Sequence, residues 1–151
     1  MAKKKKSKKR PLKIGLYVGS FNPLHEGHLD VINKGCMVFD KVIVAQAVKP
    51  GEHFEPLAID ADPKKVTCIN YDIMTVELIQ RLKPTALIRG LRNNIDFTNE
   101  QAFQYMIEDQ LIDLLGIEFP IVYFISPREL VHFSSTSFRE IAEVEARQKK
   151  E

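Results

Sequence analysis

Short apolar segments rich in β-branched residues alternate with segments of helical periodicity along almost the whole chain. The apolar segments are short enough to be buried strands and span residues 12–18, 41–48, 66–69, 85–88 and 119–125. Apolar residues recur at helical spacing in residues 28–39, 73–82, 98–115 and 136–149. This alternation predicts one doubly wound, Rossmann-like α/β domain with a parallel sheet of about five strands and right-handed crossovers.

The N-terminus differs in composition from the rest of the chain. Seven of the 22 basic residues lie in residues 3–10, so the remainder carries 15 basic against 20 acidic groups. We therefore divide the 151 residues into a disordered basic tail, residues 1–10, and one folded domain, residues 11–151. No RNA-binding aromatic motif follows the tail, so we do not expect nucleic acid as a partner beyond contacts of the tail itself.

The sequence also excludes several classes of protein. It has no run of eighteen apolar residues, and no apolar segment follows the basic stretch, so we expect a cytoplasmic protein without a membrane partner. Cys36 and Cys68 lie far apart in apolar segments, and the chain has only four histidines. We therefore expect no metal site built from side chains, and no activated cysteine.

A turn with two histidines follows the first predicted strand. Residues 19–28 read Gly-Ser-Phe-Asn-Pro-Leu-His-Glu-Gly-His and lead directly into a predicted helix. A helix N-terminus at the carboxyl edge of a parallel sheet offers free N–H groups and a positive dipole end to an anion, and phosphate is the expected guest. The imidazoles of His25 and His28 add donors, and Gly27 between them leaves room for close approach.

Three blocks in the chain resemble the phosphopantetheine adenylyltransferases of the nucleotidylyltransferase superfamily. Residues 25–28 are similar to the superfamily signature (Thr/His)-x-Gly-His. Residues 86–92, Ala-Leu-Ile-Arg-Gly-Leu-Arg, are followed by Asp96-Phe97 and Glu100, as in that family. Residues 133–136, Phe-Ser-Ser-Thr, resemble a family segment that opens a helix, and they also read as an ordinary helix cap. The resemblance covers roughly residues 12–145.

The resemblance implies a reaction and its partners. The family transfers AMP from ATP to 4′-phosphopantetheine, which gives dephospho-coenzyme A and pyrophosphate, and it works with Mg²⁺ bound to ATP. Its bacterial members are hexamers, so we expect a homo-oligomer. Such a transfer needs no covalent intermediate, because an acceptor oxygen attacks the α-phosphorus in line. The expected catalyst therefore positions the substrates and neutralises charge.

The resemblance also implies roles for individual residues. His28 and Ser20 are the expected catalytic residues. The expected ATP-binding residues are Ser20, Phe21, His25, His28, Arg92, Glu100, Ser135 and Thr136. The expected acceptor-binding residues are Ser20, Lys49, Ile73, Met74 and Arg89. We further expect Gly90 to form a tight turn that carries a neighbouring guanidinium into the site.

Some residues depart from the family pattern and keep alternatives open. The lysine that bacterial members carry after the second strand has no clear counterpart, and Lys49 or His53 are the candidates to replace it. At the position of Asn22 the family mostly has Asp. The asparagine makes this segment more similar to the nicotinate mononucleotide adenylyltransferases. The block at residues 86–92 and the absence of Trp favour phosphopantetheine. The alternatives are another phosphorylated acceptor, such as a pyridine mononucleotide, or a non-catalytic relative that binds nucleotide or nucleic acid.

Overall fold

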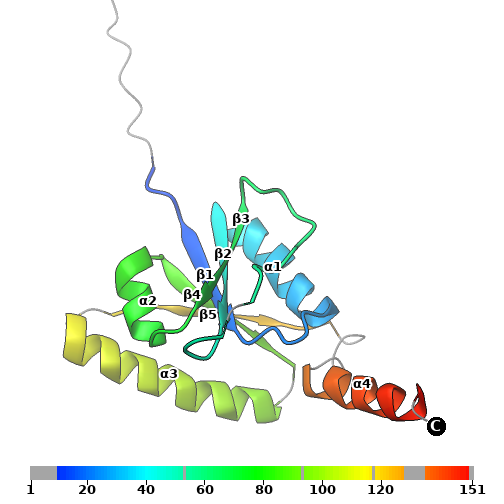
Figure 1. The fold of residues 1–151 in the computed structure, drawn as a ribbon. Coiled ribbons are helices and arrows are strands. Elements are labelled where there is room, and N and C mark those ends of the chain that lie inside the picture. Colours follow the sequence, from blue (N-terminus) through cyan, green and yellow to red (C-terminus); the bar gives the residue numbers. More distant parts are fainter. Residues whose placement is uncertain (1–9, 53, 93, 117, 128–134, 150–151) are drawn as a thin grey trace, which may run out of the picture.

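A computed structural model describes residues 10–52, 54–92, 94–116, 118–127 and 135–149 of the chain. It contains one parallel sheet with the strand order β3-β2-β1-β4-β5 (Figure 1). The strands are β1 (Ile14–Gly19), β2 (Lys41–Ala47), β3 (Val66–Tyr71), β4 (Ala86–Leu91) and β5 (Ile121–Ile125). The helices are α1 (Glu26–Val38), α2 (Thr75–Leu82), α3 (Asn94–Leu115) and α4 (Ser135–Lys149). The α/β fold class predicted from the sequence is therefore confirmed.

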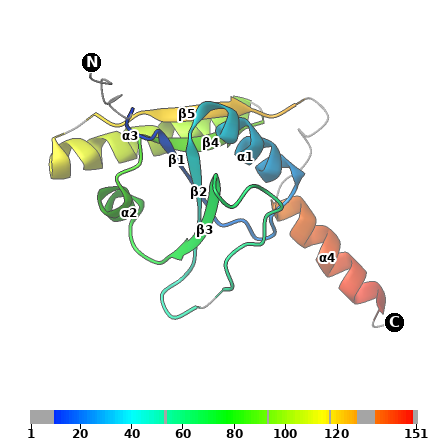
Figure 2. The same ribbon diagram turned by 90° about the horizontal axis from the view of Figure 1, so that it is seen from above.

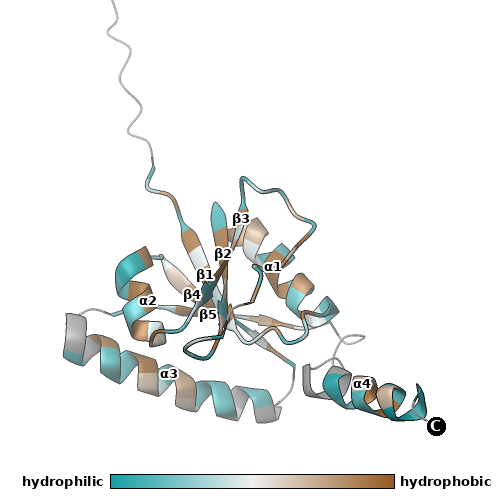
Figure 3. Cartoon of the chain, in the orientation of Figure 1, coloured by the Kyte–Doolittle hydropathy of each residue, from teal (hydrophilic) through white to brown (hydrophobic). Residues whose placement is uncertain are grey.

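Alternation along β1 divides the core into two layers. Leu16 and Val18 face a cluster that includes buried residues of α2 and α3, whereas Tyr17 faces a cluster that includes Val31 of α1. Helices therefore cover both faces of the sheet, as Figures 1 and 2 show from two directions. Figure 3 shows apolar residues concentrated in the strands and on the inner sides of the helices. Burial of these alternating faces is the main stabilising contribution expected for such a sheet.

The strand order reverses at β1, which lies between β2 and β4. After β1 the chain crosses by α1 to β2 on one side, whereas β4 pairs with the other side of β1. Loops that leave the carboxyl ends of β1 and β4 diverge at this point and open a crevice. The fold thus places the turn after β1 and the end of β4 side by side.

The structure corrects the expectation of a tight turn at Gly90. β4 continues through Arg89 and Gly90 to Leu91, beyond the predicted end at residue 88. A Cβ added at Gly90 would lie 2.9 Å from Cγ2 of Val31 on α1. Gly90 is therefore required for close packing of α1 on β4. The prediction of a tight turn at this glycine was wrong, because the residue has a packing role inside a strand.

Other boundaries differ from the sequence prediction by a few residues. α1 begins at Glu26 and α3 at Asn94, both earlier than predicted, and α2 begins later, at Thr75. Arg10, the last residue of the predicted tail, forms an ion pair with Asp40 at 2.8 Å, whereas residues 1–9 lie outside the described residues. In the described part of the chain, no helix is both long and apolar enough to cross a membrane.

Candidate active site

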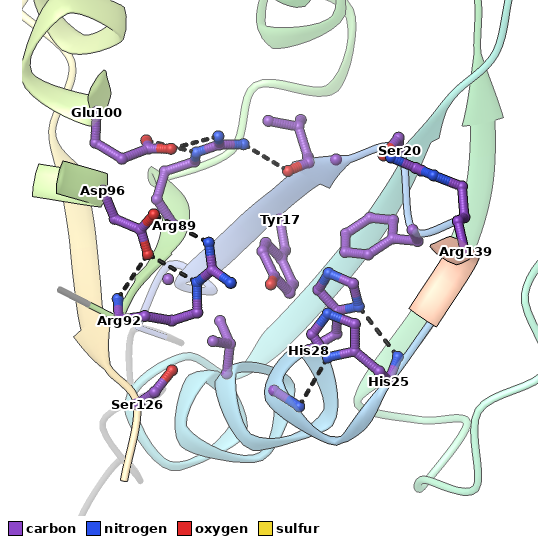
Figure 4. Close-up of a pocket in the computed structure, with 16 residues that line it drawn as sticks. Tyr17, Ser20, His25, His28, Arg89, Arg92, Asp96, Glu100, Ser126 and Arg139 are labelled. Atoms are coloured by element: carbon purple, nitrogen blue, oxygen red, sulfur yellow. Dashed lines mark hydrogen bonds and ion pairs between the residues drawn. The ribbon is translucent and has the colours of Figure 1, made fainter. Parts of the chain in front are cut away.

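A cleft of about 350 Å³ lies at the carboxyl ends of β1 and β4, beside the N-terminus of α1 (Figure 4). Its walls combine aromatic rings, two imidazoles, hydroxyls, three guanidinium groups and two carboxylates. The lining residues are Tyr17, Val18, Gly19, Ser20, Phe21, His25, Gly27, His28, Val31, Arg89, Gly90, Arg92, Asp96, Glu100, Ser126 and Arg139. The crevice predicted by the strand order therefore holds most of the polar residues that the sequence singled out.

His25 and His28 cap the N-terminus of α1 reciprocally. The backbone N–H of Gly27 donates to Nδ1 of His25 at 3.1 Å, and the backbone N–H of His25 donates to Nδ1 of His28 at 3.2 Å. The two rings stack with centroids 3.8 Å apart. A Cβ at Gly27 would lie 2.9 Å from Cε1 of His25, so the residue between the histidines must be small. In each neutral imidazole the proton is therefore on Nε2, because Nδ1 acts as an acceptor.

The surroundings keep both imidazoles neutral near pH 7. Burial, together with smaller contributions from the neighbouring His25 and Arg92, lowers the pKa of His28 to about 3. Burial and Arg92 also lower the pKa of His25. The ring of Phe21 meets the ring of His28 edge to face at 4.9 Å between centroids. His28 is thus a neutral, fixed group whose Nε2–H is available as a donor.

Arg89 links the end of β1 to α3. Its Nε and Nη2 donate to the two carboxylate oxygens of Glu100 at 2.8 and 2.6 Å, and its Nη1 donates to the carbonyl of Val18 at 2.8 Å (Figure 4). The guanidinium also lies 4.7 Å from the ring centroid of Phe103. Burial by itself would lower the pKa of Arg89, but its hydrogen bonds to the Glu100 carboxylate and the negative charge of that carboxylate outweigh burial and raise the pKa. Arg89 is therefore a charged group held in one orientation.

Two further arginines line the cleft. Arg92 pairs with Asp96, with Nε to Oδ2 at 2.8 Å and Nη2 to Oδ1 at 3.0 Å. Arg139 of α4 donates from Nη1 to the carbonyl of Asn22 at 2.8 Å. The lining contains three guanidinium groups and only two carboxylates, with the imidazoles neutral. The cleft therefore favours a polyanion such as a nucleotide phosphate chain.

The structure brings together most, but not all, of the residues predicted for the site. Ser20, Phe21, His25, His28, Arg89, Arg92 and Glu100 line the cleft. Three of the five predicted acceptor residues do not line it: Lys49 is exposed, Ile73 packs against the core, and Met74 is 52% exposed at the start of α2. The backbones of Ser135 and Thr136 belong to α4, but their side chains, and all of His53 and of the predicted cap at residue 134, lie outside the described residues.

Sequence reasoning gave no role to several residues that line the cleft. Asp96 belongs to the second block that carries the resemblance and Arg139 follows the third, but their partners could not be read from spacing. Ser126 directly follows β5, and its position at the carboxyl end of a strand was a usable signal. Tyr17 lies within the apolar segment of the first predicted strand, so nothing in the sequence distinguished it from a core residue. Burial is the main cause of its raised pKa, so the phenol is protonated near pH 7.

Comparisons with known proteins agree with this geometry. The model of the cytidylyltransferase-like family matches residues 16–141. The phosphopantetheine adenylyltransferase of Chloroflexus aurantiacus is 35% identical over 140 residues, which cover 87% of this chain and 84% of that protein. The phosphopantetheine adenylyltransferase of Streptococcus pneumoniae is 32% identical over 139 residues, 85% of this chain and 83% of that protein.

A solved structure shares the fold at lower similarity. The lipopolysaccharide core biosynthesis protein of Thermoplasma volcanium superposes with a TM-score of 0.50 at 18% identity, over 77% of this chain and 98% of that one. Fold and family match together define an α/β protein of the nucleotidylyltransferase type. The chain belongs to the cytidylyltransferase-like family and, within it, to the phosphopantetheine adenylyltransferases. The resemblance and the enzyme class inferred from the sequence are therefore confirmed.

Proposed function

We propose that the protein transfers AMP from ATP to 4′-phosphopantetheine. In this reaction an oxygen of the acceptor phosphate forms a bond to the α-phosphorus of ATP. The bond between the α-phosphorus and the bridging oxygen breaks, and pyrophosphate leaves with that oxygen and its electrons. The products are dephospho-coenzyme A and pyrophosphate. The family relationship and the chemistry of the cleft support the proposal.

The observation that carries the proposal is the neutral, capped imidazole of His28 at the start of α1. Its Nδ1 accepts from the backbone N–H of His25, so Nε2–H is the group left to serve a ligand. Because burial lowers its pKa to about 3, His28 brings a hydrogen-bond donor without the desolvation of a full charge. A donor held in place before reaction lowers the free energy of charge that develops on the α-phosphate in the transition state.

The arginines complete a site for phosphate groups. Arg92 and Arg139 come from opposite walls, and each is held by a protein acceptor, so their guanidinium groups are positioned before substrate enters. Ser20 adds a hydroxyl at the turn after β1. We assign these groups to the phosphates of ATP. Arg89 is held by Glu100 and Val18, and we assign it to the side of the cleft that receives the acceptor phosphate.

Magnesium enters this proposal only as part of the nucleotide substrate. Both carboxylates that line the cleft accept hydrogen bonds from arginines, with Asp96 on Arg92 and Glu100 on Arg89. Among the residues that the structure describes, no group of three or more His, Cys, Asp or Glu side chains is placed to hold a metal ion. These residues do not form a magnesium site of their own. We therefore propose that Mg²⁺ arrives bound to ATP and that the protein itself holds no metal ion for the reaction.

We further propose that the protein works in the cytoplasm as a homo-oligomer, a hexamer on the family resemblance. Ile141 and Val144 on α4 are 54% and 51% exposed, and in Figure 2 this helix extends away from the sheet. Exposed apolar side chains on a projecting helix are consistent with contact between subunits. Light scattering coupled to size exclusion measures the mass directly, and a monomer at micromolar concentration contradicts this part of the proposal.

Pyrophosphate release from ATP and Mg²⁺ with a panel of acceptors tests the reaction. We expect release with 4′-phosphopantetheine and none with nicotinate or nicotinamide mononucleotide. Arg10→Ala, an exposed position outside the cleft, is the matched control for His28→Ala, and only the latter should lose activity. Release with a pyridine mononucleotide alone would move the acceptor to that class. ATP binding without release for any acceptor would indicate a non-catalytic relative.

A further inference from the structure

Gln46 is a buried polar residue next to the turn that follows β1. It lies near the end of β2, in register with Gly19 of β1, and its side chain is 5% exposed. Its Nε2 donates to the backbone carbonyl of Ser20 at 3.0 Å. Gln46 does not line the cleft, but it contacts the backbone of a residue that does. It therefore acts on the site through the turn.

Burial of the Gln46 side-chain amide is unfavourable for the stability of the fold. Its Oε1 is buried and has no hydrogen-bond partner in the part of the chain that the structure describes. Burying an unsatisfied amide oxygen is unfavourable, and an apolar side chain of similar volume would avoid that cost. Packing alone therefore does not account for a glutamine here. The bond to the Ser20 carbonyl is the polar contact that distinguishes Gln46 from an apolar residue.

The contact has a geometric consequence for the next peptide N–H. In a trans peptide the C=O and N–H bonds point in opposite directions. The carbonyl of Ser20 points to Gln46, so the N–H of Phe21 in the same peptide points away from Gln46. Phe21 lines the cleft, and its N–H has no acceptor among the described residues. The turn thus has a backbone donor whose direction is set by Gln46.

The backbone at Phe21 does not hold this orientation by its own preference. Its φ is +44°, in the left-handed region that is unfavourable for a residue with a side chain. The ring is buried and packs edge to face on Tyr17 at 4.9 Å between centroids. Ring packing fixes the side chain, and the bond from Gln46 fixes the preceding peptide plane. Both contacts offset the unfavourable backbone conformation.

We propose that Gln46 is a positioning residue that orients the Ser20–Phe21 peptide, so that the N–H of Phe21 meets a phosphate oxygen of the nucleotide. The expected effect of Gln46 on the reaction rate rests on the proposed nucleotidyl transfer. The orientation of the Ser20–Phe21 peptide is a property of the turn and does not depend on that reaction. Loss of the Nε2 donor frees the peptide plane to rotate. A preorganised donor that loses its orientation affects the transition state more than ground-state binding.

Asn70 provides a matched control. It is the register partner of Gln46 on β3, and it also has a buried carbonyl oxygen without a partner in the described residues. Its Nδ2 donates to the carbonyl of Phe54, in the loop between β2 and β3 and outside the cleft. Asn70 is half-buried whereas Gln46 is buried, but Asn70→Leu also removes an amide with a buried, unpartnered oxygen at the carboxyl end of the sheet, without touching the Ser20 turn. Gln46→Met removes the donor of interest at nearly constant volume.

Two measurements test the proposal. Gln46→Met should lower kcat about tenfold and change the affinity for ATP less than about threefold. The unfolding free energy of Gln46→Met should be no lower than that of Asn70→Leu. Asn70→Leu should keep kcat within about twofold of wild type. In amide NMR spectra, inorganic pyrophosphate should shift the Phe21 N–H of the wild-type protein, and the shift should be reduced in Gln46→Met. The second measurement needs no acceptor, so it stands even if the proposed reaction fails.

Kinetics of Gln46→Met within twofold of wild type, with an unchanged Phe21 shift, would overturn the proposal. Equal losses of kcat in Gln46→Met and Asn70→Leu would also overturn it, because the effect would then belong to any buried amide at this edge. If Gln46→Met does not fold, the wild-type spectrum decides. A Phe21 amide that pyrophosphate does not move contradicts the assigned role.

Discussion

The backbone N–H of His25 donates to Nδ1 of His28 at 3.2 Å, and this single bond fixes which nitrogen of His28 carries the proton. The bond belongs to the helix cap, since the Nδ1 of His25 in turn accepts from the N–H of Gly27. One local structure therefore starts α1 and sets the tautomer of the residue assigned to the α-phosphate.

The first prediction concerns the cap. His25→Ala removes the side-chain acceptor at the N-terminus of α1, and we expect the unfolding free energy to fall by about 1 kcal/mol. His25→Asn, which can accept from the same N–H, should recover most of this loss. Urea unfolding followed by circular dichroism measures both. An Ala variant as stable as the wild type would show that the cap does not stabilise the helix.

The second prediction concerns pH. Folding lowers the pKa of His28 from an ordinary value of 6.5 to about 3, so between these values the unfolded chain binds a proton that the folded chain does not. Stability should therefore fall as the pH drops below about 6.5, by up to about 1.4 kcal/mol per pH unit from this group. His28→Gln removes the group. Urea titrations from pH 7 to pH 4.5 should give a steeper loss for the wild type, and parallel curves contradict the assignment.

The third prediction concerns the ion pair between Arg89 and Glu100. Their side chains are only 22% and 15% exposed, so Glu100→Ala leaves a largely buried guanidinium without its carboxylate. We expect a loss of about 3 kcal/mol in unfolding free energy. Arg10→Ala breaks an ion pair in which Arg10 is 67% exposed, and it should cost much less than Glu100→Ala because solvent screens the pair. Equal costs in chemical denaturation would mean that the inner pair is not structural.

The fourth prediction concerns Gly90. A Cβ there would meet Cγ2 of Val31 at 2.9 Å, so Gly90→Ala should lower the unfolding free energy by about 1–3 kcal/mol. The same change should cost less in a Val31→Ala background, because the colliding methyl is then absent. A double-mutant cycle measures this coupling. Independent, additive effects would show that the close approach of α1 to β4 does not limit the size of residue 90.

Hydrophobic periodicity was sufficient to predict the order and type of all the elements that the structure describes, because apolar residues recur at the period of a strand or a helix in each of them, including α4, whose apolar residues Ile141 and Val144 are exposed. Boundaries were less predictable. A tight turn was expected at Gly90 because it stands between the apolar residues Ile88 and Leu91, yet β4 runs through it. Packing of Val31 explains this glycine, and such a long-range contact leaves no local signal in the sequence.

The site was predictable where a motif reports backbone geometry, and less so elsewhere. The position of His28 followed from the strand-turn-helix context, but the capping role of His25 did not, because histidine is an uncommon cap. Gln46 stood in an apolar run with no pattern that indicated its bond to Ser20. Lys49 was predicted from resemblance, and the structure leaves it exposed outside the cleft, so its role in acceptor binding stays a prediction.

The central claim is that His28 stabilises the transition state more than the bound nucleotide. Its measurement compares kcat for pyrophosphate release with the affinity for a non-hydrolysable ATP analogue, in the wild type and in folded His28→Ala. We expect kcat to fall by roughly 10²- to 10³-fold, the usual cost of one preorganised donor, while the affinity changes less than about threefold. Turnover within a few fold of wild type, or an affinity that falls in proportion to kcat, would contradict the account.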